Sequence, residues 1–344
     1  MSLRRLAPLG LLLAPLALLL TLAACGQKPT APAANGRTAI RFATDWKAEA
    51  EHGGFYQALA TGEYARRGLD VRILPGGPGS NVPQLLASGA AEMGIGSNSF
   101  VAMTLAQEHV PVKAVMAAMQ KDPWVLMAHP DAGVNSIADM KGRPMILSDA
   151  SLTGVWVWLK AKYGLTDAQV RKYTFNSGPF IQNRASIQQG YVTSEPYTIE
   201  KQGGFKPRVF VLSDEGYPGY ADLVLVPDAL IASNPKAVQA FVDATAAGWK
   251  SYLHGDPKPA DAMILKDNPE MTQDVLDQAR DKMRQYEIVD GKASAPIGAM
   301  TDARWQALSD VMNKAGVLKP GTDVKTAYTL QFAPKQGAAR EAGR

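Results

Sequence analysis

Four side chains from two distant segments have the chemistry to bind a flat nitrogen-containing molecule. Asp45 and Trp46 precede His52 in one segment, and Glu195 stands directly before a proline in the other. A tryptophan face stacks on a planar heterocycle, and a carboxylate accepts paired hydrogen bonds from an amino or amidine-like edge. The structural alternatives are that Trp46 packs inside the fold, His52 caps a helix and Glu195 forms a salt bridge.

Further polar and aromatic side chains stand where we expect strands to end and helices to begin. Such positions line clefts in α/β proteins, and helix starts offer free N–H groups to anions and carbonyl oxygens. Some have a second interpretation: Asn81 can cap a helix, and Tyr217 can belong to a surface loop. The remaining predicted ligand-binding residues are Tyr56, Asn81, Ser97, Asn98, Trp124, Ser148, Ser151, Thr153, Trp156, Tyr197 and Tyr217.

Several classes of site are not expected from this sequence. Four scattered histidines and a single cysteine provide neither a metal cluster nor a nucleophile–base pair, and one cysteine cannot form an intramolecular disulfide. The loop at residues 76–81 lacks the lysine of a phosphate-binding P-loop. Basic residues are scattered rather than clustered, which argues against nucleic acid. We therefore expect a monomer that binds a small molecule without a cofactor or metal.

The first 25 residues have the features of a secretory leader. Arg4 and Arg5 precede an apolar run that is too short and too interrupted by proline to span a membrane. Leu22-Ala23-Ala24-Cys25 then resembles the lipobox of bacterial lipoproteins, which implies that the Cys25 thiol is acylated and anchors the protein. The alternative is an ordinary signal peptide cut beside an incidental cysteine. Residues 26–37, rich in proline, alanine and glycine, are predicted to be a flexible tether.

The elements that must position the candidate residues alternate between short apolar runs and longer helical stretches, which is typical of an α/β fold. Strands are predicted at residues 40–43, 69–74, 92–95, 112–119, 124–128, 144–147, 172–175, 191–193, 209–212 and 223–226. Helices are predicted at residues 54–65, 82–88, 100–108, 153–163, 182–189, 235–253, 257–268, 272–283 and 301–315.

The order of these elements predicts two lobes joined by a hinge. Residues 38–124 and 225–330 are expected to form lobe 1, residues 125–224 lobe 2, and residues 331–344 a tail. The chain would leave lobe 1 and return to it, so two crossover strands would form the hinge. A ligand pocket is then expected between the lobes, where the carboxyl ends of strands face each other and closure is possible.

Short motifs in a characteristic order resemble a known family. They include Asp45-Trp46, the run from Glu51 to Ala58, Gly76-Gly77-Pro78, Gly94-Ile95-Gly96-Ser97 and the run from Gly190 to Tyr197. This pattern resembles ABC-importer substrate-binding proteins of the thiamine-pyrimidine-precursor and alkanesulfonate type, within the pyrimidine-synthase-like fold family. The resemblance implies a type II periplasmic-binding-protein fold at the periplasmic face of a bacterial membrane, delivering a solute to an ABC permease and its ATPase.

The sequence leaves alternatives open for both the ligand and the class of protein. A thiamine-type pyrimidine suits Trp46 and Glu195, whereas an alkanesulfonate, taurine, nitrate or a flavin-like heterocycle would be other cargoes. A pyrimidine synthase of yeast shares the fold family, but its dense cysteine motif is absent here, although His52 falls at the position of its histidine. A membrane-tethered structural protein would explain the leader but not the cleft.

Overall fold

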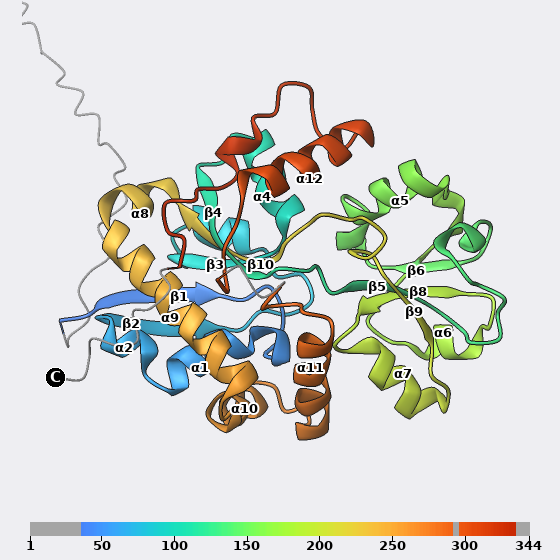
Figure 1. Cartoon of the computed structure of the whole chain (residues 1–344), viewed down its shortest axis with the longest axis horizontal. Coiled ribbons are helices and arrows are strands. Elements are labelled where there is room, and N and C mark those ends of the chain that lie inside the picture. Colours follow the sequence, from blue (N-terminus) through green and yellow to red (C-terminus); the bar gives the residue numbers. More distant parts are fainter. Residues whose placement is uncertain (1–35, 292–295, 335–344) are drawn as a thin grey trace, which may run out of the picture.

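Two five-stranded sheets form the framework of the computed structural model, which describes residues 36–291 and 296–334 (Figure 1). The first sheet has the order β2-β1-β3-β10-β4 and consists of β1 (Thr38–Ala43), β2 (Leu69–Leu74), β3 (Met93–Asn98), β4 (Val112–Met119) and β10 (Ala221–Pro227). The second has the order β7-β6-β8-β5-β9 and consists of β5 (Trp124–Ala128), β6 (Met145–Leu147), β7 (Val170–Lys172), β8 (Ile187–Tyr191) and β9 (Arg208–Val211). The predicted α/β class is confirmed.

The two sheets follow the same pairing pattern. In the first, β1 is parallel to β2 and β3, and β10 is antiparallel to β3 and β4. In the second, β6 is parallel to β7 and β8, and β5 is antiparallel to β8 and β9. Each sheet with its helices is one lobe, and this repeated build is that of a two-lobed periplasmic-binding-protein fold.

Helices cover both sheets (Figure 1). The helices around the first sheet are α1 (Gly53–Ala60), α2 (Glu63–Arg66), α3 (Val82–Ala87), α4 (Ser99–Gln107), α8 (Asp228–Ser233), α9 (Pro235–His254), α10 (Lys258–Asp267), α11 (Gln273–Gln285) and α12 (Asp302–Lys314). Around the second are α5 (Val155–Tyr163), α6 (Gly178–Gln182) and α7 (Glu195–Gly203). Short 3₁₀ turns lie at Ala50–His52, Ile137–Met140, Asp149–Ser151, Asp167–Gln169 and Val324–Thr326.

The chain passes between the lobes twice. It first runs from β4 into β5, and it returns from β9 into β10 (Figure 1). These are the two predicted crossovers. Both faces of the crossing strands are apolar: Val125 and Met127 of β5 belong to one buried cluster, whereas Leu126 and Ala128 belong to the other. β5 is therefore a strand buried on both faces, and its sequence is a continuous apolar run.

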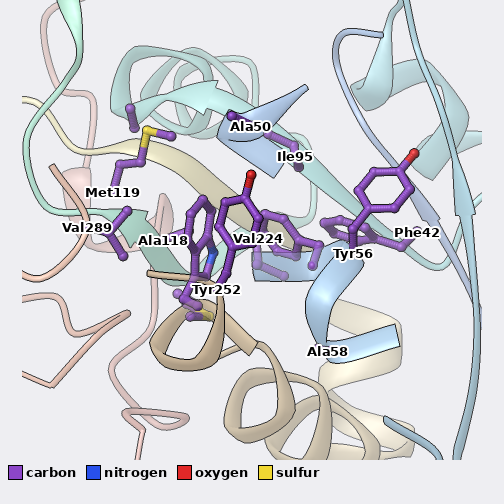
Figure 2. Close-up of a cluster of buried hydrophobic side chains, with 14 of the residues drawn as sticks. Phe42, Ala50, Tyr56, Ala58, Ile95, Ala118, Met119, Val224, Tyr252 and Val289 are labelled. Carbon is purple, nitrogen blue, oxygen red and sulfur yellow. The ribbon is translucent and has the colours of Figure 1, made fainter. Parts of the chain in front are cut away.

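One of these buried clusters lies where α1 and α9 pack on the first sheet. Figure 2 shows Phe42, Ile95 and Val224 of the sheet beside Tyr56 of α1 and Tyr252 of α9. The close approach of the two helices depends on glycine, because a Cβ at Gly53 or Gly54 would come within 2.5 Å of the ring of Tyr252 or Trp249. Gly53 and Gly54 therefore serve the packing of α1 against α9.

Four predicted elements are wrong in type or extent. The predicted strand at 191–193 overlaps the observed one only at Tyr191, where β8 ends. Residues 182–189 are not a helix: α6 ends at Gln182, and β8 begins at Ile187 because the strand pairs between β5 and β6. The predicted helix at 54–65 is divided at Gly62, whose φ of 76° stops α1. The predicted strand at 172–175 ends at Lys172, and Phe175 lies in the left-handed region with a φ of 61°.

The leader with Cys25 and most of the predicted tether lie outside the described residues. Within residues 36–291 and 296–334, no helix is both long and apolar enough to cross a bilayer.

Candidate ligand-binding site between the lobes

The candidate site lies where the carboxyl ends of parallel strands from both lobes meet. Asp45 and Trp46 follow β1, and Asn98 ends β3 in the first sheet. In the second, Ser148 follows β6 and Glu195 opens α7 after β8. Open α/β sheets bind ligands at such ends because loop side chains and helix starts converge there. The two sets come from different lobes and contact each other at the points described next.

Trp46 meets an aromatic ring of the opposite lobe. Its ring centroid is 4.5 Å from that of Phe175, which in turn is 5.2 Å from Tyr173. Two hydrogen bonds hold the Trp46 backbone in place: its carbonyl accepts from Thr44 Oγ1 at 2.8 Å and from the Gly76 amide at 3.0 Å. The glycine-rich loop thus supports the aromatic residue. This position is compatible with both interpretations of Trp46, because a ring at the boundary between the lobes can pack against Phe175 and can also stack on a ligand.

His52 lies beside Asp45 at the base of this site. The imidazole is buried, and its Nε2 is 3.4 Å from Asp45 Oδ1. Its Nδ1 is buried without a hydrogen-bond partner among the described residues. The side chain does not cap α1, because no such hydrogen bond is formed at the helix start. This imidazole nitrogen thus has an unused capacity for one hydrogen bond.

A second contact joins the lobes near His52. Thr193, which follows β8, donates its hydroxyl to Glu51 Oε1, and both side chains are buried. Gln278 of α11 donates to the Thr193 carbonyl from the first lobe. The hydroxyl of Tyr197, a predicted ligand residue, donates to Asp274 of the first lobe at 2.7 Å and so takes part in a contact between the lobes. The two lobes are therefore held together around the site.

Carboxyl groups from several segments converge on the same region. Burial raises the pKa of Glu49 well above its ordinary value, and the charges of Glu51, Asp45, Asp222 and Glu195 raise it further. In the same way, burial followed by the neighbouring carboxylates raises the pKa of Asp222. Mutual repulsion of this kind requires the groups to lie close together in a poorly solvated space. The site is therefore a cluster of carboxyl groups, some of which hold a proton more readily than in water, and it can form hydrogen bonds with a polar ligand.

Glu195 is oriented by its own lobe. Its Oε2 accepts the Tyr191 amide at 2.8 Å, and its Oε1 accepts the Tyr173 hydroxyl at 3.4 Å. Burial raises its pKa to about 7, against the opposing effect of the Tyr191 amide. Gly190 permits this position, because a Cβ there would lie 2.7 Å from the Glu195 Cβ. The salt-bridge alternative for Glu195 finds no support, since its partners are an amide and a phenol.

Several predicted ligand residues lie in the protein core. Tyr56 is buried in α1 and donates to Asp267 at 3.0 Å, and Trp156 donates its Nε1 to Asp167 at 2.7 Å. Trp124 is buried in β5, and Tyr217 packs edge-on against Trp158 with ring centroids 5.3 Å apart. The sequence does not separate these from site residues, because large aromatics are also the ordinary content of a core.

The polar candidates at helix starts mostly serve the backbone or each other. Asn81 caps α3, and Asn98 caps α4 by accepting the Phe100 amide at 3.0 Å. The hydroxyls of Ser148 and Ser151 lie 2.8 Å apart, and both bond the buried Gln189. The remaining two are Ser97, half-buried within β3, and Thr153, exposed beside α5.

The structure also brings in residues that we did not predict as ligand contacts. Phe175, Tyr173, Tyr191 and Thr193 come from the second lobe, and Asp222 comes from β10 of the first sheet. Asp222 is unusual in its backbone as well, since this buried aspartate has a φ of 47°, in the left-handed region, within β10. Glu51 and Thr193 stood in the motif runs, so closer attention to these runs could have found them. Across the described ranges, no group of three or more His, Cys, Asp or Glu side chains could hold a metal.

Three curated relatives match this chain at low identity and over different shares of its length. The riboflavin-binding protein RibY of Chloroflexus aurantiacus is 26% identical and covers 96% of this chain and 98% of the relative. The formylaminopyrimidine-binding protein of Halalkalibacterium halodurans is 27% identical over 69% of this chain and 71% of the relative. A 4-amino-5-hydroxymethyl-2-methylpyrimidine phosphate synthase of Legionella pneumophila is 20% identical over 87% and 93%.

A solved structure confirms the fold, and a family model identifies the family. The periplasmic aliphatic sulphonate binding protein SsuA of Escherichia coli superposes with a TM-score of 0.61 at 13% identity, covering 85% of this chain and 92% of SsuA. This likeness establishes the type II periplasmic-binding-protein fold. The model described as NMT1/THI5 like matches residues 49–260, which is more than half of the sequence. The chain belongs to the NMT1/THI5-like family.

Proposed function

We propose that this protein is the substrate-binding component of an ABC importer and captures a planar nitrogen heterocycle between its lobes. The observation that carries the proposal is the meeting of Trp46 and Phe175, one from each lobe, above a set of converging carboxyl groups. Aromatic faces bind a flat ring by stacking, and carboxylates bind its N–H edge. An aminopyrimidine offers both features.

The acidic character of the site argues against the anionic cargoes. A sulfonate or nitrate needs donors and positive charge, whereas the carboxyl groups of Asp45, Glu51 and Glu195 carry no positive charge in either protonation state. The structural likeness to a sulphonate-binding protein is at 13% identity and supports only the fold. The ligand preference therefore rests on the side chains of this chain.

A flavin is the second candidate, and a specific observation favours it. The riboflavin-binding relative matches this chain over nearly the whole length of both proteins, whereas the pyrimidine-binding relative matches about seven-tenths. The isoalloxazine ring is planar and has an N–H edge, so it satisfies the same stacking and hydrogen-bonding requirements. Both candidates belong to the proposed ligand class.

The proposal has two further parts: the protein binds its ligand without converting it, and it is exported and anchored by lipid. Two of the curated relatives are binding proteins, and one is a synthase. Lys47, the lysine nearest His52 in sequence, pairs with Glu270 rather than with a group of the site. We propose that the leader directs the chain to the periplasmic side, where acylated Cys25 anchors it beside the permease.

A ligand screen tests this function. Purified full-length mature protein is titrated by calorimetry with an aminopyrimidine, with riboflavin and with an alkanesulfonate, and small molecules that co-purify are identified by mass spectrometry. A bound heterocycle, recovered chemically intact, supports the proposal, and it should raise the melting temperature in proportion to occupancy. Tight binding of the alkanesulfonate alone, or recovery of a chemically altered heterocycle, would refute it.

A further inference from the structure

A polar groove extends the candidate site into the second lobe. One wall is the segment after β7, with Tyr173, Phe175 and Asn176, and the other is α7, with Glu195 at its start. Phe175 and Glu195 thus belong to both the groove and the interlobe site. The groove has a volume of about 320 Å³. This lies near the lower end of the range of about 300 to 1,000 Å³ for small-molecule sites, so the groove suits a short chain rather than a fused ring.

The α7 wall presents a row of uncharged hydrogen-bonding groups. Ser194, Thr198 and Gln202 line the groove and are four residues apart, so they lie along one face of the helix. Hydroxyl and amide groups both donate and accept hydrogen bonds. Such a row matches a chain of hydroxyl groups, whose neighbouring carbons each offer a donor and an acceptor.

The opposite wall is held firmly in place. Ser177 Oγ accepts the Gln188 side-chain amide at 2.9 Å, and Asn176 Oδ1 accepts the Gly178 amide at 2.8 Å. Phe175 stands above them with half of its surface, 49%, exposed. Its strained left-handed backbone turns the ring out toward Trp46 rather than into the lobe. Phe175 therefore both contacts the Trp46 ring and lines the groove.

The charge of the groove limits what it can bind. Among the described residues that line it, Glu195 is the carboxylate, and none is a lysine or arginine. A phosphate or sulfonate end would find no cation here and would face a carboxylate, whereas hydroxyl groups donate readily to that carboxylate.

We infer that the groove binds an uncharged hydroxylated chain attached to the heterocycle, so the ligand is a ring with a polyol substituent rather than a bare pyrimidine. This inference rests on the proposed function, because the heterocycle must bind at Trp46 and Phe175, whose rings separate to admit it, while its chain follows α7. It distinguishes the two heterocycles that the proposed function leaves open.

Three flavins that share one ring system test the inference by calorimetry on the full-length mature protein. Riboflavin carries a ribityl chain, lumiflavin carries a methyl group in its place, and flavin mononucleotide ends in phosphate. We expect riboflavin to bind at least roughly tenfold more tightly than lumiflavin, as one or two net hydrogen bonds would give. Flavin mononucleotide should bind more weakly than riboflavin. An aminopyrimidine serves as the fourth ligand.

The double variant Thr198→Val with Gln202→Leu removes hydrogen-bonding groups from the α7 wall. We expect it to lose most of the riboflavin preference, whereas Gln306→Leu, an exposed glutamine on α12, should keep it. Thermal melts verify that each variant folds. If a variant does not fold, the ratio of the riboflavin and lumiflavin affinities of the wild-type protein still tests the inference.

The failing outcomes are distinct. Equal affinity for riboflavin and lumiflavin, tighter binding of flavin mononucleotide than of riboflavin, or binding of the aminopyrimidine but no flavin overturns the groove assignment and leaves the proposed function standing. A double variant that folds and keeps the full riboflavin preference overturns it as well. Absence of binding to any of the four heterocycles overturns both.

Discussion

The rings of Trp46 and Phe175 lie 4.5 Å apart, although one follows β1 of the first sheet and the other follows β7 of the second. Neither ring is fully buried, and Phe175 occupies a left-handed conformation that a phenylalanine rarely adopts. Strained residues of this kind are often found at functional sites, where the surrounding structure maintains the strain. A planar ligand can enter between the two rings only if they separate.

Phe175→Asn should change stability and binding in opposite directions. Asparagine tolerates the left-handed region, whose cost for other residues is about 1–2 kcal/mol. We therefore expect the free energy of unfolding to stay constant or rise by up to about 1 kcal/mol. Riboflavin affinity should fall by up to about tenfold, since a stacking contact contributes roughly 0.5–1.5 kcal/mol. Urea unfolding and calorimetry measure the two effects.

His109→Asn provides the matched control for this substitution. His109 also has a positive φ, 55°, but it is exposed at the end of α4 and away from the second lobe. It should relieve backbone strain without changing riboflavin affinity. Unchanged affinity in Phe175→Asn would remove Phe175 from the site, whatever its stability.

Glu195→Gln should weaken an aminopyrimidine by about ten- to a hundredfold. A charge-assisted hydrogen bond contributes roughly 1.5–3 kcal/mol, and an amide cannot accept two hydrogen bonds from a donor edge. An alkanesulfonate should bind the variant as well as or better than wild type, because a negative charge has been removed. Calorimetry with both ligands checks this. Glu200→Gln, an exposed position on the same helix, should leave both affinities unchanged.

The stability of the protein should fall as the pH rises from about 4 to about 7. Burial raises the folded-state pKa of Asp122 and of Glu195 to about 7, whereas unfolded carboxyl groups titrate near 4. Between these values the folded state binds more protons than the unfolded state, so raising the pH favours unfolding. We expect a higher melting temperature at pH 5 than at pH 8, with little further change above pH 8 from these two groups.

Asp122→Asn should reduce this pH dependence. Asp122 Oδ1 accepts the Trp124 amide at 3.0 Å, and its Oδ2 is buried without a hydrogen-bond partner in the part of the chain that the structure describes. Asparagine keeps the first contact and mimics the protonated acid at every pH. Melts at pH 5 and pH 8 should differ less in the variant than in wild type. An equal difference in both proteins would show that Asp122 does not contribute.

Local periodicity predicted the strands that are apolar on both faces. Residues 112–119 and 124–128 coincide with β4 and β5, because unbroken apolar runs of this length are typical of buried strands. It failed at residues 182–189, which were predicted as a helix but include part of β8, where the side chains of Gln188 and Gln189 are buried and hydrogen-bonded within the second lobe. The burial of a polar side chain depends on distant partners, which a local pattern does not contain.

The site was predictable as far as it is local. Asp45, Trp46 and Glu195 were predicted because each follows a strand and carries a recognisable chemical group. Phe175 was missed, since its role depends on Trp46 more than a hundred positions earlier in the chain. Tyr56 was placed in the site because a phenol in a core and a phenol in a cleft have the same sequence signature.

The Cys25 anchor can be tested independently of the ligand. Cys25→Ser removes the thiol that would be acylated, so the variant should no longer incorporate labelled fatty acid, and any mature protein should leave the membrane fraction. Metabolic labelling and fractionation of cells that express the full chain measure both. Labelling of the variant at the wild-type level would refute the lipobox assignment.

Thr193→Val should favour separation of the two lobes. The threonine hydroxyl donates to Glu51 across the lobe boundary, and valine keeps the shape of the side chain but removes the donor. Leaving the buried Glu51 carboxyl without this donor costs about 1–3 kcal/mol of stability. Separation of the lobes recovers part of that cost, because it lets the carboxyl bind water. Small-angle X-ray scattering of the ligand-free variant should therefore show a larger radius of gyration, and riboflavin should bind more weakly.

Thr245→Val separates this effect from a general loss of stability. Thr245 also makes a buried hydroxyl contact, to Tyr64 at 2.8 Å, but both residues belong to the first lobe. This variant should lower the melting temperature without enlarging the radius of gyration, because no contact between the lobes is lost. If Thr193→Val likewise leaves the radius of gyration unchanged while lowering the melting temperature, the Glu51–Thr193 contact stabilises the fold and does not hold the lobes together.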